Sequence, residues 1–253
     1  MIRIEDRGAL RIVTLAHGPV NALDLELCTA LTTAVEEAED PAVHGLLLRA
    51  DGKAFSAGVD LLRVLDEGEP YIRAFLPALT KTLVRLFALE KPVVAAVGGH
   101  AIAGGCLVAL SADRRIMAAG RSKVGVPELK VGVPFPLIAL ELLRFSLRPE
   151  VLGEVIGDGT LVGPERAREL GIIHEVVPAE DLEARAVEVL SSLADLPPAA
   201  HALTKWALRR PTLDRWRRAT AEVDDVVMTQ WCDPEALRRI RRYVDATLGG
   251  GKS

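Results

Sequence analysis

The sequence predicts an α/β fold with a largely parallel sheet and a helical C-terminal region. Short apolar strands alternate with amphipathic helices along most of the 253 residues, a pattern typical of βα crossovers and parallel strand pairing. Two strand–loop–helix units follow the same plan. Beyond about residue 197 the strand pattern ends and the chain is rich in Ala, Leu and Arg. We therefore expect a core over residues 1–196 and a helical region over residues 197–253 that packs either on this core or on another subunit.

The N-terminal part contains the first predicted elements. Alternating apolar and polar residues predict strands over residues 2–5 and 10–16. From Asp24 the apolar residues recur at helical spacing, and Asp40-Pro41 ends this helix because proline cannot continue the hydrogen-bond pattern. Residues 45–50 form a compact apolar strand, which a glycine-containing loop connects to the next helix.

The rest of the core repeats this alternation. The predicted elements are a helix over residues 70–89, a strand over 93–97, a helix from about 104 and a strand over 115–118. Residues 92–112 carry no charged side chain, but four glycines and His100 interrupt them. We therefore predict a buried strand and helix there, not a membrane span. In the tail, Pro211 and Pro234 indicate three helices.

Composition and charge exclude several classes of function. The net charge of −4 and the pI of about 5.8 argue against a nucleic-acid or anionic-membrane partner. Cysteines 28, 106 and 232 are far apart and odd in number, which favours a reduced, cytoplasmic compartment. We expect no metal and no redox cofactor, because no ligand spacing or nucleotide fingerprint occurs. Arginine runs in the tail are interspersed with acids and are interpreted as a solvated or inter-subunit face.

Two loops of small residues stand between a strand and a helix. The first, FSAGVDLL, has almost no side-chain bulk at Ser56-Ala57-Gly58, so that a ligand can approach the free N–H groups at the helix start. In the second, GGHAIAGGCLVAL, Gly104 or a neighbour can direct an N–H group at an anionic oxygen. Either loop alone is better explained as a tight turn or close packing. Their pairing in adjacent units strengthens the case for an oxyanion site.

A third feature is the acidic residue in VGVPELKVGVPFP. Glu128 lies in an otherwise apolar segment after Pro127. Burial among Val, Leu and Pro would raise the pKa of its carboxyl group toward a range useful for acid/base chemistry. An exposed turn glutamate beside Lys130 is an equally good interpretation.

The two loops, the Glu128 segment and the preceding PVNALDLEL resemble the enoyl-CoA hydratase/isomerase (crotonase) superfamily over roughly Val13 to Pro178. The resemblance implies a crotonase-type spiral of repeated ββα units, followed by helices that form trimers or dimers of trimers. It also implies an enzyme of fatty-acid metabolism whose substrate is an acyl-CoA thioester. Coenzyme A then arrives as part of the substrate, and no other cofactor is expected.

Site residues follow from the same resemblance. The N–H groups of Val59 and Gly104 would bind the thioester oxygen as it becomes enolate-like, with Glu128 as acid and base. The segment expected to line the adenine and pantetheine path of coenzyme A comprises Ala57, Gly58, Val59, Asp60 and Leu61.

One departure from the hydratase pattern bears on the reaction. Hydratases of the superfamily hold water between two glutamates, and Leu107 occupies the position of the first. A single carboxylate still supports a Δ3,Δ2-enoyl-CoA isomerase, which moves a double bond without water. The alternatives are a hydratase, or another lyase or hydrolase of this superfamily, with a second acid from elsewhere, and a non-catalytic acyl-CoA or RNA-binding protein.

Overall fold

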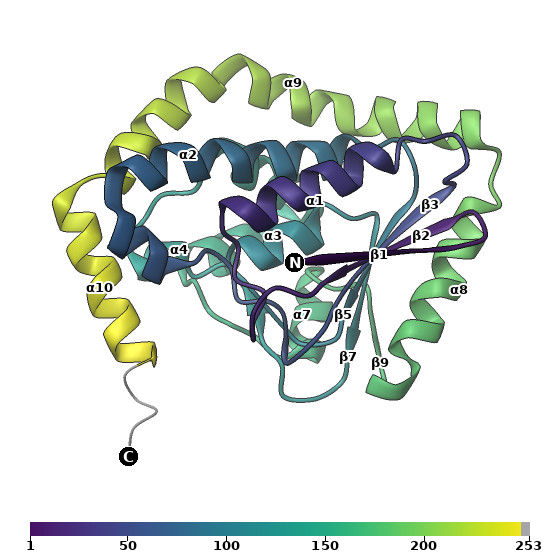
Figure 1. Ribbon diagram of the computed structural model, residues 1–253, viewed down its shortest axis with the longest axis horizontal. Coiled ribbons are helices and arrows are strands. Elements are labelled where there is room, and N and C mark those ends of the chain that lie inside the picture. The colour runs from purple at the N-terminus through teal and green to yellow at the C-terminus, as the bar shows by residue number, and fades with distance from the viewer. Residues whose placement is uncertain (249–253) are drawn as a thin grey trace.

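The computed structural model describes residues 1–248 and contains a six-stranded sheet between helices (Figure 1). Its strands, in spatial order, are β1 (Ile2–Arg7), β2 (Leu10–Leu15), β3 (Gly45–Ala50), β5 (Val93–Val97), β7 (Arg114–Ala118) and β9 (Glu175–Val177). All neighbours pair in parallel except β1 and β2. The predicted α/β sheet is confirmed. The terminal GGGKS of the predicted tail lies outside the described residues.

Helices cover both faces of this sheet, which explains the continuous apolar strands. Leu46 and Leu48 of β3 face the main core, together with α1 (Leu25–Glu37) and α2 (Leu61–Ala88). Leu47 points the other way, into a second cluster with α8 (Leu182–Ala194). Alternate side chains of one strand are therefore buried on opposite faces, and the strand shows no polar alternation.

Helix α2 begins earlier than the helix predicted over residues 70–89. It starts at Leu61, directly after the first small-residue loop, and Gly68 breaks it with a φ of 65° and a ψ of −148°. The other helices of the core are α3 (Gly104–Leu110), α4 (Glu128–Val131), α5 (Leu137–Ser146), α6 (Pro149–Leu152) and α7 (Pro164–Leu170), with a π turn over Gly153–Gly157 and a 3-10 turn over Ala179–Asp181.

A second, three-stranded sheet was not predicted. It consists of β4 (Ala54–Ser56), β6 (His100–Ile102) and β8 (Val124–Gly125), paired in parallel. These strands are too short for a periodic pattern. Because parallel strands end at the same edge, this sheet delivers both small-residue loops and the Glu128 segment to one place.

The C-terminal region contains two described helices, so the prediction of three is wrong. Helix α9 (Pro198–Trp231) runs through Pro211 without a break, and α10 (Pro234–Leu248) follows at one end of the molecule (Figure 1). Pro211 removes only one N–H donor, and packing against α2 and α5 keeps the helix intact on both sides. No helix within residues 1–248 combines the length and apolarity needed to cross a bilayer.

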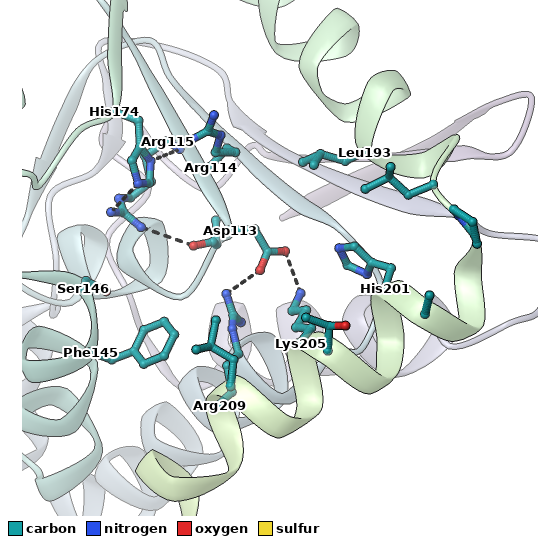
Figure 2. A pocket seen from close by; sticks show the side chains of 16 residues that line it. Asp113, Arg114, Arg115, Phe145, Ser146, His174, Leu193, His201, Lys205 and Arg209 are labelled. Atoms are coloured by element: carbon teal, nitrogen blue, oxygen red, sulfur yellow. Dashed lines mark hydrogen bonds and ion pairs between the residues drawn. The ribbon is translucent and has the colours of Figure 1, made fainter.

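Buried charges anchor the first half of α9 to the core (Figure 2). The Asp113 carboxylate accepts a hydrogen bond from Lys205 Nζ and another from Arg209 Nη2, each at 2.6 Å. Lys205 also donates to the carbonyl of Lys91, and Arg209 donates to the carbonyl of Phe87. Both cations are almost fully buried, with side-chain exposures of 6% and 5%. Burying these two charged side chains is therefore tolerated only because the Asp113 carboxylate and the main-chain carbonyls bind them.

We predict that Asp113→Ala lowers the free energy of unfolding by about 3 kcal/mol, because it leaves two buried cations without their carboxylate. Urea unfolding of the variant beside the parent protein measures this loss. Asp214→Ala is the matched control, because Asp214 pairs with exposed Arg210 and Arg217. It should cost less than about 1 kcal/mol. Equal losses in the two variants would contradict the anchoring role.

Candidate active site

The two small-residue loops pack main chain against main chain. Gly58 has a φ of 86°, and a Cβ atom there would lie 2.6 Å from the Ile102 carbonyl oxygen and 3.3 Å from the Gly104 nitrogen. Leu23 holds the first loop in place, since its N–H donates to the Gly58 carbonyl at 2.7 Å and its carbonyl accepts from Asp60 N–H at 2.9 Å. Only glycine fits position 58.

This packing leaves two main-chain donors free. The N–H groups of Val59 and Gly104 have no hydrogen-bond acceptor among residues 1–248. Gly104 begins α3, where the first N–H groups have no partner inside the helix. The close approach of Gly58 to Gly104 brings these donors to one region, which is the arrangement needed to bind an oxyanion.

Ala103 has an unusual main-chain conformation just before Gly104. Its φ of 52° and ψ of −125° lie in a region that alanine rarely adopts. The Ala103 N–H donates to the Gly125 carbonyl at 2.8 Å, and its carbonyl accepts from Leu107 N–H at 3.1 Å. These bonds hold the strained turn that changes the chain direction from β6 into α3.

Glu128 begins the short helix α4. The Pro127 carbonyl accepts hydrogen bonds from the N–H groups of Lys130 and Val131, and the Glu128 carbonyl accepts from those of Gly132 and Val133. Gly132 ends the turn with a φ of 94°. This compact turn directs the Glu128 side chain inward, and only 7% of the residue is exposed.

The Glu128 carboxyl group lines a small cavity of about 50 Å³. The other lining residues are mostly apolar: Ala57, Val59, Leu61, Ile102, Ala103, Pro127, Val131, Val133, Trp231 and Tyr243. Burial raises the pKa of Glu128 to about 8, because an apolar environment disfavours the charged form. Its Oε2 atom has no hydrogen-bond partner among the described residues. A buried carboxyl with one unpartnered oxygen and a pKa near neutrality is suited to accept and return a proton.

The structure brings most of the predicted site residues together. Ala57, Val59, Leu61 and Glu128 line the cavity, and Gly58 and Gly104 form the main chain behind it. The Asp60 side chain does not line it and instead caps α2 by accepting from Arg63 N–H.

No second acid lies in the described part of the site. Leu107 is 2% exposed and belongs to the main core, outside the cavity lining. Among residues 1–248, Glu128 is the one carboxylate that lines this cavity.

Sequence reasoning missed two aromatic residues of the cavity. Trp231 comes from the end of α9, where its Nε1 donates to the Pro134 carbonyl at 3.0 Å. Tyr243 comes from α10. The C-terminal helices therefore complete the site of their own chain. Aromatic side chains in an arginine-rich tail are the only local signal, and they do not indicate what the helix packs against.

A larger cavity of about 590 Å³ adjoins Asp113, at the anchored end of α9 (Figure 2). It contains none of the predicted site residues. Its buried cations Lys205 and Arg209 already donate to Asp113 and to main-chain carbonyls. Arg115 likewise donates to the carbonyl of Ile172. Residues 1–248 also contain no group of three or more His, Cys, Asp or Glu side chains placed to hold a metal. The absence of a metal stays a prediction.

The sequence matches one family model over most of its length. The family model for enoyl-CoA hydratase/isomerase matches residues 5–239. The chain therefore belongs to the enoyl-CoA hydratase/isomerase family, and it is an enzyme of this family.

Individual relatives include isomerases and enzymes that add or remove water. The chain is 31% identical to human mitochondrial enoyl-CoA delta isomerase 1 over 214 residues, which are 83% of this chain and 71% of that protein. It is 32% identical to the carnitinyl-CoA dehydratase of Salmonella typhi over 206 residues, which are 81% of this chain and 78% of that protein.

Solved structures confirm the predicted crotonase-type fold. The structure of human mitochondrial delta3-delta2-enoyl-CoA isomerase superposes with a TM-score of 0.93 at 27% identity, covering 100% of this chain and 99% of that chain. The enoyl-CoA hydratase EchA3 of Mycobacterium ulcerans superposes with a TM-score of 0.83 at 28% identity, covering 88% of this chain and 98% of that chain.

We predict that Gly58→Ala destabilises the protein more than Gly68→Ala. Both glycines have positive φ, at 86° and 65°, so alanine at either position would cost roughly 1–3 kcal/mol in backbone strain. A Cβ atom at Gly58 would also overlap Ile102 and Ala103, whereas at Gly68 no atom lies within 4 Å. The overlap should add roughly 2 kcal/mol. Equal unfolding free energies in urea would contradict the close loop packing.

A second prediction concerns Glu128 and pH. Since its pKa is raised from the ordinary 4.5 to about 8, the folded protein binds this proton more tightly than the unfolded chain does. The contribution of Glu128 to the free energy of unfolding therefore falls as the pH rises from about 4.5 to 8. Glu128→Gln removes this pH dependence. The free energy of unfolding of the variant should exceed that of the parent by on the order of 4 kcal/mol at pH 9, and the two should be similar at pH 4.5. Parallel stability curves for the two proteins would contradict the burial of a titrating carboxyl.

Proposed function

We propose that this enzyme is a Δ3,Δ2-enoyl-CoA isomerase in which Glu128 alone carries the proton. The observation behind this proposal is that Glu128 is the one carboxylate among the described cavity-lining residues, in otherwise apolar surroundings. Hydration by the two-carboxylate mechanism would need a second acid to activate water, and no other acid lines this cavity among residues 1–248. Moving a double bond needs only a base that can return its proton to another carbon.

The two free N–H groups supply the electrostatic part of the reaction. Loss of the C2 proton from a 3-enoyl-CoA places negative charge on the thioester oxygen. The N–H donors of Val59 and Gly104 would stabilise that charge, and they do so without reorganisation because the loop packing fixes them in advance. We propose that Ala57, Gly58, Val59, Asp60 and Leu61 follow the coenzyme A part of the substrate.

Glu128 performs the proton transfer in two steps. The carboxylate takes the C2 proton, and the released electron pair forms a dienolate with double bonds at C1=C2 and C3=C4. The resulting carboxylic acid then protonates C4, which places the carbon–carbon double bond between C2 and C3 and restores the thioester carbonyl and the carboxylate. A pKa of about 8 suits both steps, because both the protonated and the ionised form of Glu128 are accessible near neutral pH.

Relatives support this assignment without deciding it. An isomerase is among the most similar proteins, but a dehydratase shares comparable identity. One family therefore carries out several reactions, and the number of acids in the cavity is the feature that distinguishes them here.

Assembly and location are further parts of the proposal. We propose a homotrimer or a dimer of trimers in the cytoplasm. Several large apolar side chains of α9 remain exposed in the single chain, and a second copy would cover them: Leu203, Trp206, Leu208 and Val226. Several arginines of the tail are paired with acids of their own helices, such as Arg217 with Asp214 and Arg238 with Glu235. These pairs favour a solvated face over an RNA-binding one.

We predict that the pure protein isomerises a 3-enoyl-CoA rapidly and hydrates a trans-2-enoyl-CoA negligibly. Glu128→Gln should lower isomerisation by about 10³-fold while the thioester still binds, since the variant keeps the main-chain donors but loses the base. Spectrophotometric assays of both substrates with both proteins measure this. Strong hydration by the parent protein would refute the single-acid mechanism and favour the hydratase alternative.

A further inference from the structure

We propose that Tyr243 is a positioning residue for Glu128: the Tyr243 hydroxyl donates a hydrogen bond to one water in the cavity, and this water donates to the unpartnered Oε2 atom of Glu128. The kinetic part of this inference rests on the proposed function, whereas the hydrogen-bonded pair itself does not.

The packing of α10 brings Tyr243 to Glu128. The side chain of Arg239 lies against Gly132, where an added Cβ would be 2.9 Å from Arg239 Cδ. Tyr243 follows Arg239 by four residues, so it projects from the same face of α10, one turn further along. It lines the same cavity as Glu128, which lies at the opposite end of α4 from Gly132.

Tyr243 is the side chain able to donate into this cavity. Among the described lining residues, only Trp231 and Tyr243 carry a side-chain donor, and the Trp231 N–H already donates to the Pro134 carbonyl. Burial and the nearby Glu128 carboxylate raise the pKa of Tyr243, so the phenol keeps its proton. The Oε2 atom of Glu128 is buried and lacks a partner. A donor and an acceptor with no other partner among residues 1–248 thus line one cavity.

The size of the cavity fits a bridging water. Its volume of about 50 Å³ exceeds the roughly 15 Å³ that a single water requires, and both groups can bond to that water. A hydrogen bond to the charged form stabilises the carboxylate, which opposes the effect of burial. Tyr243 would thereby keep a useful fraction of Glu128 ionised and hold it in one orientation for proton abstraction.

Tyr243→Phe tests this inference, with Tyr71→Phe as the matched control. Tyr71 is the other tyrosine of the chain. Its hydroxyl accepts from the Leu25 N–H, and it does not line the cavity. The first measurement is an infrared titration of the carboxylic-acid band that Glu128→Gln abolishes. The second is the pH profile of kcat/KM for a 3-enoyl-CoA.

We expect Tyr243→Phe to raise the pKa of Glu128 by about half a unit to one unit, as the loss of one hydrogen bond predicts. The acidic limb of kcat/KM should move upward by the same amount, and kcat should fall by roughly tenfold with KM within about twofold. Tyr71→Phe should leave both curves in place.

An unchanged Glu128 titration in Tyr243→Phe would overturn the proposal, as would an equal shift in Tyr71→Phe. The infrared titration does not depend on which reaction is catalysed. A shifted titration in a protein that fails to isomerise 3-enoyl-CoA would therefore uphold the pair and refute the proposed function.

Discussion

The contact between the two small-residue loops is the constraint on which the site depends. A single Cβ atom at Gly58 would collide with the carbonyl of Ile102 and with Ala103. Because the loops approach at main-chain distance, the N–H groups of Val59 and Gly104 come together and the cavity in front of them stays narrow. The positive φ of Ala103 is the local strain that accompanies this arrangement. A looser junction would leave the donors without a shared target.

The C-terminal helices line the cavity of their own chain and also carry the proposed oligomer contact. Asp113 locks the first half of α9 through Lys205 and Arg209. The other end of the same helix places Trp231 in the cavity, and α10 then brings in Tyr243. The buried charge cluster and the cavity therefore lie at opposite ends of the same helix.

Glu128 illustrates a conflict between stability and chemistry. The folded protein places an ionisable carboxyl in apolar surroundings, with one oxygen lacking a partner within the described chain. An apolar residue of similar size would be better tolerated at neutral pH. The destabilising burial is what brings the pKa of the carboxyl group into the range where it can both take and return a proton.

Local pattern in the sequence by itself determined the parallel α/β class and the strands over residues 45–50 and 93–97, because burial on both faces leaves a direct record in composition. It left the burial of Glu128 open. The motifs around Gly58, Gly104 and Glu128 also sufficed for the family. Tertiary structure decided the rest. The strands of the second sheet are too short to show periodicity, packing overrode the helix break expected at Pro211, and Trp231 and Tyr243 reach the cavity only because distant helices fold back over it. Periodicity records which face of an element is buried, but it does not record which other segment covers that face.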